Sequence, residues 1–116
     1  MALNAPELDP LIRQPTRLRI MSALVSLDEG EQLDFMDLLA LMEMTPGNMG
    51  AHLQKLEKAG YVGIDKTFVE RRPKTWLAAT AQGRRAFAAH VDALEAIARQ
   101  GEKEQGDSTN EENNDA

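Results

Sequence analysis

The sequence predicts an α+β domain, mostly helical, in which a helix-turn-helix is followed by a two-stranded hairpin and a C-terminal helix. Three patterns carry this prediction. Apolar residues recur at helical spacing over 46–59, short alternating runs flank a basic stretch at 69–74, and a second helical stripe runs through 81–99. With 116 residues, 42% hydrophobic and 28% charged, the chain has the composition of one ordinary globular domain.

The first helix is expected to begin at Pro15, after an N-terminal arm and first turn that span 1–14. Asp9 can cap that turn, and Gln14 ends it because a residue before proline avoids the helical region. An apolar stripe follows along the first helix, formed by Leu18, Ile20, Met21 and Leu24.

A second, shorter helix should follow a very short extended piece at Leu33. Asp34 is its expected N-cap. Asp37 lies in the first turn of the helix, where a negative charge interacts favourably with the helix dipole. Its inner face is expected to consist of Phe35, Leu38, Leu39 and Met42. A tight link then leads into the next helix, and two short helices so connected form a helix-turn-helix.

The third helix, 46–59, can be defined at both ends. Thr45 can cap its first amides, Pro46 suits the first helical position, and Gly60 supplies the left-handed residue that ends it. Its core stripe is Met49, Leu53 and Leu56. Its free face carries small, amide and basic side chains suited to approaching a polyanion and its base edges, namely Gly47, Asn48, Ala51, Gln54, Lys55 and Lys58.

A hairpin with a basic tip is expected next, because two alternating runs, 62–68 and 75–79, flank the segment 69–74. Thr80 then caps a final helix over 81–99. Phe87, Val91, Leu94 and Ala98 fall on one side of this helix, and this stripe is longer than a small core needs to cover. We therefore expect a C-terminal dimerisation helix, in which this stripe forms the interface between two copies of the chain. The alternative is that the helix folds back over the first helix and buries the stripe within one chain. Beyond Arg99, residues 100–116 are expected to form a disordered acidic tail.

The distribution of charge reconciles a net charge of -6 with binding to a polyanion. Residues 101–116 hold one lysine against six acids, whereas 45–85 hold eight lysines or arginines against three acids. The local potential at a docking face matters more than the overall charge.

Several other functions are disfavoured by the sequence. Zero cysteines exclude thiolate metal sites and thiol nucleophiles, and the two histidines, His52 and His90, lie in different predicted helices. No serine or carboxylate partner for a histidine and no phosphate-binding glycine loop is recognisable, so we expect neither an enzyme nor a metal or other cofactor. Without an apolar run of about 18 residues or a signal core, we expect a cytoplasmic protein without a membrane partner.

Particular segments of the sequence resemble the winged helix-turn-helix domain of bacterial regulators of the MarR and ArsR type. QPTRLRIMSAL is similar to the first helix of ArsR-like regulators, GNMGAHLQKLEKAGYV to their recognition helix, and RRPKTW with TAQGRRAF to a small single-domain subgroup. The resemblance implies a transcriptional regulator that binds double-stranded DNA as a homodimer. It places helix 46–59 in the major groove and the wing, 69–74, on the adjacent backbone or minor groove.

The residues that the resemblance assigns to DNA are Asn48, Ala51, His52 and Lys55 on the helix and Arg71, Arg72 and Lys74 on the wing. We add Gly47 and Gln54 to the predicted DNA-binding residues, because the helical spacing places them on the same free face. His52 lies between the two faces of the helix, so a packed histidine is as good an interpretation as a DNA contact. A homodimer would ask for an inverted-repeat operator, and a small-molecule effector is left open. The alternative function is a winged helix used for protein contact without specific DNA binding.

Overall fold

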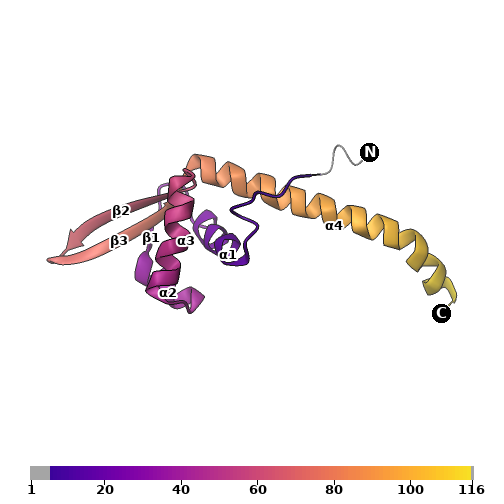
Figure 1. The fold of residues 1–116 in the computed structure, drawn as a ribbon, viewed down its shortest axis with the longest axis horizontal. Coiled ribbons are helices and arrows are strands. Elements are labelled where there is room, and N and C mark those ends of the chain that lie inside the picture. Colours follow the sequence, from indigo (N-terminus) through magenta and orange to yellow (C-terminus); the bar gives the residue numbers. More distant parts are fainter. Residues whose placement is uncertain (1–5, 116) are drawn as a thin grey trace.

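Four helices and three strands follow one another over residues 6–115, the part of the chain that the computed structural model describes, with side chains described for residues 6–101 (Figure 1). In order they are α1 (Pro15–Val25), β1 (Leu33–Asp34), α2 (Phe35–Met42), α3 (Pro46–Lys58), β2 (Val62–Val69), β3 (Arg72–Ala79) and α4 (Ala81–Asp115). This architecture confirms the predicted α+β fold class.

The turn before α1 is held by Asp9, as the sequence predicts. Its Oδ1 accepts the N–H groups of Leu11 and Ile12 at 2.8 and 3.1 Å. The side chain of Gln14 then caps α1 by accepting the N–H of Arg17 at 2.8 Å. The turn and the helix therefore have separate caps, which places Ile12 in the core with an exposed fraction of 0%.

The caps of the helix-turn-helix are also the predicted residues. Asp34 Oδ1 accepts the N–H of Met36 at the start of α2, and Thr45 Oγ1 accepts the N–H of Asn48 at the start of α3. At the other end of α3, Gly60 has a φ of 83°, the N–H of Tyr61 donates to the carbonyl of Leu56, and that of Gly60 donates to Glu57. These two bonds form a Schellman motif, which ends α3 and turns the chain into β2.

The three strands form an antiparallel sheet in the order β1-β3-β2, with Leu33 opposite Leu77 on one side of β3 and Ile64 opposite it on the other. The hairpin differs from the sequence prediction. The predicted tip, 69–74, contains a turn of only two residues, Glu70 and Arg71, and β3 begins at Arg72. Both turn residues have positive φ, 51° and 68°, as in the type I′ turns whose twist matches that of paired strands.

Pro73 lies inside β3, opposite Phe68. In a hairpin closed by a two-residue turn, the pair next to the turn is hydrogen-bonded and the following pair is not. Pro73 therefore loses no bond to β2, and β1 pairs with β3 only at Trp76 and Leu77. Pro73, which falls within the predicted tip, is therefore compatible with a position in β3.

The core lies between α1, α2, α3 and the sheet. The three stripe residues of α3, Met49, Leu53 and Leu56, are at most 2% exposed. They pack with the other buried apolar side chains, which are Ile12, Ile20, Met21, Leu24, Leu38, Met42, Val62 and Leu77.

The start of α4 is fitted closely to the end of α3. Thr80 caps α4 by accepting the N–H of Gly83, and its hydroxyl donates to the carbonyl of Gly60. A Cβ on Gly83 would lie only 2.1 Å from the carbonyl oxygen of Tyr61, so only glycine allows this approach. Further along α4, His90 is 2% exposed, and its Nδ1 accepts the N–H of Asp9 at 3.0 Å.

α4 continues as a helix to Asp115, whereas the sequence predicted its end near Arg99 and a disordered tail over 100–116. Residues 100–115 present no apolar stripe, so hydrophobic periodicity could not predict helix there. Residues 102–105, Glu-Lys-Glu-Gln, nevertheless have good helix propensity, and extending an existing helix is far less costly than nucleating one. For the glycine, aspartate, serine, threonine and asparagine that follow at 106–110, propensity gives no explanation of the helix. The helix projects from the domain in Figure 1, and the described chain measures 69 × 32 × 25 Å. No helix among the described residues is long and apolar enough to cross a membrane.

Candidate nucleic-acid interface

The face of α3 opposite its core stripe is open to solvent. Each residue predicted to lie there is exposed, namely Gly47, Asn48, Ala51, Gln54, Lys55 and Lys58. This arrangement follows from the periodicity of the helix, because its buried residues lie at i, i+4 and i+7 and leave the other side free. Thr45 caps the helix by accepting the backbone N–H of Asn48, whose side chain is exposed.

Two glycines of α3, Gly47 and Gly50, have no packing role within the domain. A Cβ added at either position would meet nothing within 4 Å among the described residues. Glycine in a helix interior costs about 1 kcal/mol relative to alanine, so the fold alone would favour alanine, above all at Gly50. The small side of α3 instead suits close approach by an external surface. Gly50 was not among the predicted site residues.

His52 is half-buried at the edge of this face, and its Nδ1 lies 3.2 Å from Nη1 of Arg17 in α1. Burial, followed by the positive charges of Arg17 and Lys55, lowers the pKa of His52. One ring nitrogen is thus bonded inside the domain, as the packed interpretation expects, while a DNA contact by the partly exposed ring stays a prediction.

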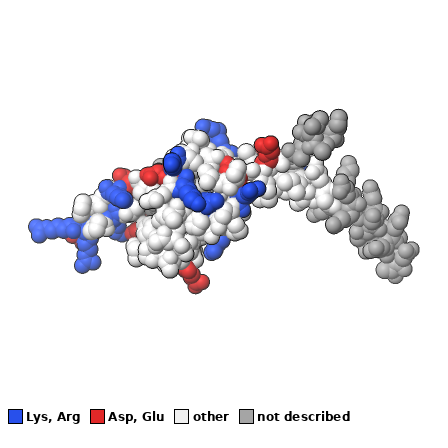
Figure 2. Space-filling view, in the orientation of Figure 1, with Lys and Arg blue, Asp and Glu red and all other residues white. Residues whose placement is uncertain are grey.

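The wing places Arg71 and Arg72 at its end. Arg71 lies in the turn and Arg72 is the first residue of β3, and both are exposed. Figure 2 shows lysine and arginine side chains at the end of the hairpin and, on the same face, over the middle of the domain. The wing therefore carries exposed positive charge at its end.

Lys74 differs from the other basic residues of the wing because its ammonium is bonded to a carboxylate. Its Nζ donates to Oδ2 of Asp34, the residue that caps α2, and lies 5.4 Å from the centre of the Trp76 ring. The hydrogen bond from Lys74, and then that from the N–H of Met36, lowers the pKa of Asp34, and the same bond raises the pKa of Lys74. Lys74 thus joins the wing to α2.

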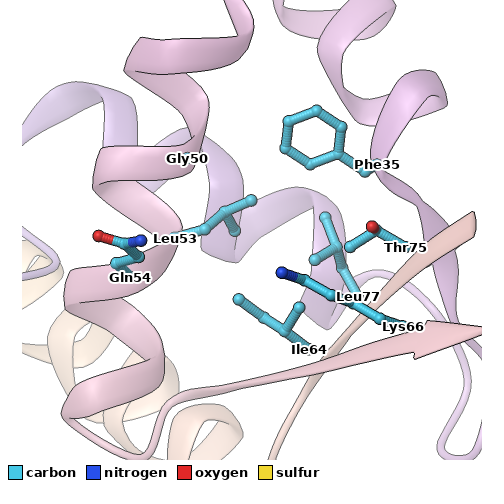
Figure 3. Close-up of a pocket in the computed structure, with 8 residues that line it drawn as sticks. All are labelled: Phe35, Gly50, Leu53, Gln54, Ile64, Lys66, Thr75 and Leu77. Carbon is cyan, nitrogen blue, oxygen red and sulfur yellow. The ribbon is translucent and has the colours of Figure 1, made fainter. Parts of the chain in front are cut away.

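A groove of about 240 Å³ lies between α3 and the hairpin. Apolar side chains from both sides line it, and Figure 3 shows the Lys66 ammonium directed towards α3. Its lining consists of Phe35, Gly50, Leu53, Gln54, Ile64, Lys66, Thr75 and Leu77. Lys66 and Thr75 were not predicted as site residues, although each lies two residues from an apolar lining residue, Ile64 or Leu77, and therefore on the same face of the sheet.

Two further arginines, Arg17 and Arg84, are bonded within the fold. Arg17 is 9% exposed, and its Nε donates to the carbonyl of Leu11 at 2.7 Å. Arg84 of α4 donates to the carbonyls of Val25 and Leu27, 3.2 and 2.9 Å away, and so satisfies the end of α1. Their carbonyl partners are far away in sequence or lie in irregular chain, so no local pattern could identify them.

The predicted dimer stripe on α4 is divided by the fold. Phe87 packs against the core and Val91 is half-buried, whereas Leu94 is 37% exposed and Ala98 is also exposed. Ile97, beside them, is 40% exposed. His90 and Ala93 are the buried residues of this part of α4. The first turns of α4 therefore pack on the domain, and the apolar residues from Leu94 onwards are open.

No group of three metal-ligating side chains is found among the described residues, and His52 and His90 bond to different partners within the domain. The described surface instead exposes small, amide and basic groups on α3 and two arginines at the end of the hairpin.

Comparison with known proteins gives results of two kinds. The family of winged helix DNA-binding domains matches residues 16–98. An uncharacterized protein of Methanocaldococcus jannaschii is 35% identical over 75 residues, which cover 65% of this chain and 78% of that protein.

Two solved structures are similar to this fold. The transcriptional regulator homologue of Pyrococcus horikoshii OT3 has a TM-score of 0.70 and 27% identity, and the match covers 78% of this chain and 86% of that one. NadR, solved in complex with 4-hydroxyphenylacetate, has a TM-score of 0.57 and 25% identity, with 86% of this chain and 71% of that one covered. The similarity extends beyond the helix-turn-helix in both cases.

Proposed function

Because the chain belongs to the family of winged helix DNA-binding domains, we propose that it is a sequence-specific regulator of transcription that binds double-stranded DNA as a homodimer. In this proposal α3 enters the major groove, and the hairpin contacts the adjacent backbone or minor groove. The observation that carries it is the exposed face of α3, where small residues alternate with amide and basic side chains and the fold explains neither Gly47 nor Gly50.

The roles of individual residues follow from their chemistry. Asn48, Gln54 and Lys55 can reach base edges, because amides pair with adenine and ammonium groups with guanine. Gly47 and Ala51 let the helix sink into the groove. Arg71 and Arg72 supply phosphate contacts from the end of the wing, and Lys66 of β2 can add one at the groove between α3 and the hairpin.

The test is selection of bound fragments from the host genome, followed by binding measurements on the selected site. Asn48→Ala and Lys55→Ala should each weaken specific binding by about 1 to 3 kcal/mol per lost base contact. Both variants should unfold like the parent, because neither side chain belongs to the core. Arg99→Ala is the matched control, since it removes an exposed positive charge on α4. Variants that bind the selected site as tightly as the parent would contradict the proposed reading face.

Dimer formation is proposed to use the open apolar residues of α4, Leu94 and Ala98 with Ile97 beside them. Two copies related by a two-fold axis would present two α3 helices about 34 Å apart, which suits an inverted repeat. Sedimentation of the parent and of Leu94→Glu tests this. A parent dimer and a folded Leu94→Glu monomer are expected, whereas a monomeric parent at micromolar concentration would contradict the dimer.

A small-molecule effector is part of the proposal because NadR was solved with 4-hydroxyphenylacetate. Operator binding measured with and without that acid, and with and without extract of the host cell, is the corresponding test. The alternative function, protein contact without specific DNA binding, is favoured only if filter binding at low salt retains no genomic DNA. The exposed Arg71 and Arg72 at the wing tip argue against it.

A further inference from the structure

Arg17 is a buried cation that no carboxylate neutralises within residues 6–101. The side chain is 9% exposed, and the ion pairs of this part of the chain join Lys74 to Asp34 and Arg99 to Glu95. Its partners are neutral: Nε donates to the carbonyl of Leu11 at 2.7 Å, and Nη1 lies 3.2 Å from Nδ1 of His52. A buried charge held in this way is costly, so its position behind α3 calls for a reason.

The bond between Arg17 and His52 determines which nitrogen of the imidazole carries the proton. A guanidinium has five N–H donors and no acceptor, so Nδ1 of His52 must accept. In a neutral imidazole the proton then resides on Nε2, which becomes a hydrogen-bond donor only. The lowered pKa of His52 is consistent with the neutral form, since burial and the charges of Arg17 and Lys55 oppose a second proton.

The Nε2 atom of His52 is open to the outside. No hydrogen bond joins it to a described residue, and no buried side-chain nitrogen in that part of the chain lacks a partner, so Nε2 reaches solvent. His52 follows Ala51 and lies one helical turn from Asn48 and Lys55 on α3. Its donor therefore borders the exposed face of the helix.

We propose that Arg17 is a positioning residue that keeps Nδ1 of His52 as an acceptor and Nε2 as a donor. In this proposal Nε2–H of His52 donates a hydrogen bond to the N7 atom of a purine in the major groove. The proposal rests on the proposed function, in which α3 enters that groove. N7 is the acceptor that adenine and guanine share at the edge of the major groove. The amino groups of adenine and cytosine are donors, so they cannot bond to Nε2 of His52, which is itself a donor.

The first experiment is independent of DNA. Nitrogen-15 NMR of the imidazoles in the full chain distinguishes the two neutral tautomers, and the His52→Gln variant assigns the signals. At neutral pH we expect His52 to be neutral with its proton on Nε2. Arg17→Lys, which keeps a donor and a charge, should preserve this tautomer, and Arg17→Met should release it to a mixture. A proton on Nδ1 in the parent overturns the proposal.

The second experiment replaces each purine of the selected half-site by its 7-deaza analogue. One position should lower the affinity of the parent by about 10- to 100-fold, the loss expected for one base contact. His52→Gln, whose amide nitrogen can occupy the place of Nε2, should keep most of the affinity and the sensitivity to that analogue. His52→Asn, whose amide reaches only the place of Nδ1, should lose both.

The outcomes separate this role from the function on which it rests. If the chain selects a DNA site but His52→Asn binds it as tightly as the parent, the reading role of His52 is overturned while DNA binding stands. The reading of N7 is likewise overturned if every deaza analogue is tolerated, whether the His52 effect then depends on guanine O6, on thymine O4 or on one phosphate whose neutral methylphosphonate abolishes it. If the chain retains no DNA, the proposed function falls and the reading role falls with it.

Discussion

The phenol of Tyr61 donates a 2.6 Å hydrogen bond to Oδ2 of Asp9, which ties the residue that follows α3 to the turn that precedes α1. This bond, with burial and the charge of Asp9, raises the pKa of Tyr61 from 10.0 to about 12. Burial alone would raise the pKa of Asp9, but the bonds from Tyr61, Ile12 and Leu11 outweigh it and lower that pKa. The pair therefore makes stability depend on pH at both ends of the scale.

At the alkaline end, we expect the stability contributed by Tyr61 to be complete below pH 10.0 and to be lost as the pH rises towards about 12. In this window the unfolded tyrosine has released its proton and the folded one has kept it. Tyr61→Phe should lower the free energy of unfolding by about 1 to 2 kcal/mol at neutral pH. The difference from the parent should vanish at high pH. Because Tyr61 is the one tyrosine of the chain, its tyrosinate absorbance measures the folded pKa directly.

At the acid end, the sign is reversed. The lowered pKa of Asp9 contributes stability above its ordinary value of 3.8, and this stability is lost as the pH falls through the folded pKa. Urea unfolding of Asp9→Asn across this range should show a flatter pH dependence than that of the parent. An identical profile would contradict the role given to Asp9.

Gly83→Ala should destabilise the domain, because the new Cβ would lie 2.1 Å from the Tyr61 carbonyl oxygen and the backbone must move. We expect a loss of about 2 kcal/mol in the free energy of unfolding, after the gain in helix propensity is included. Gly101→Ala is the matched control, since nothing lies within 4 Å of its Cβ. Because residue 101 lies within α4, this variant should raise stability by up to about 1 kcal/mol, and no change would contradict the continuation of α4.

Gly47→Ala should separate folding from binding. The added methyl group has open space in the free protein, so the free energy of unfolding should stay the same or rise slightly. DNA binding should nevertheless weaken, because the methyl group holds α3 away from the groove floor. Fluorescence anisotropy on the selected site measures this effect. Unchanged affinity would show that α3 does not approach DNA at Gly47.

Arg72→Ala and Lys74→Ala remove the same charge from neighbouring positions of β3 but should act differently. Arg72→Ala should weaken binding to specific and random DNA alike and reduce the salt slope by about 1, as for one lost phosphate contact. Lys74→Ala should leave the slope nearly unchanged and lower stability, because Lys74 is bonded to Asp34. Equal effects of both variants on the salt slope would show that Lys74 leaves Asp34 to contact DNA.

The parts of the fold that could be predicted are those encoded locally. Both ends and the inner face of α3 follow from Thr45, Pro46, Gly60 and an apolar stripe, because a cap, a helix start and a left-handed residue act within a few positions. The exposed binding face follows from the same periodicity. The cap of α2 by Asp34 was predictable for the same reason.

The rest depends on contacts that no local pattern encodes. Lys74 and Asp34 are 40 residues apart in the sequence, and Arg17 and His52 are 35 residues apart. Arg84 lies 59 and 57 residues from the two carbonyls that it binds. The roles of these basic residues therefore emerge only when the chain is folded. The wing turn was missed because Glu70 and Arg71 adopt positive φ without the usual asparagine or glycine. Basic residues of the sequence thus divide into free and internally bonded groups that composition cannot separate.

Strand β3 has a mechanical consequence for how this domain would meet a duplex. It is paired along its length with β2 and, at Trp76 and Leu77, with β1, whose last residue Asp34 is also the cap of α2. The hairpin and the helix-turn-helix are therefore joined as one unit, and the angle between them cannot change by rotation about a single residue. If the distance between the grooves differs from the distance between α3 and the wing, the duplex must deform rather than the protein. Flexible base-pair steps between the two contact points should therefore be preferred, although the protein does not contact them.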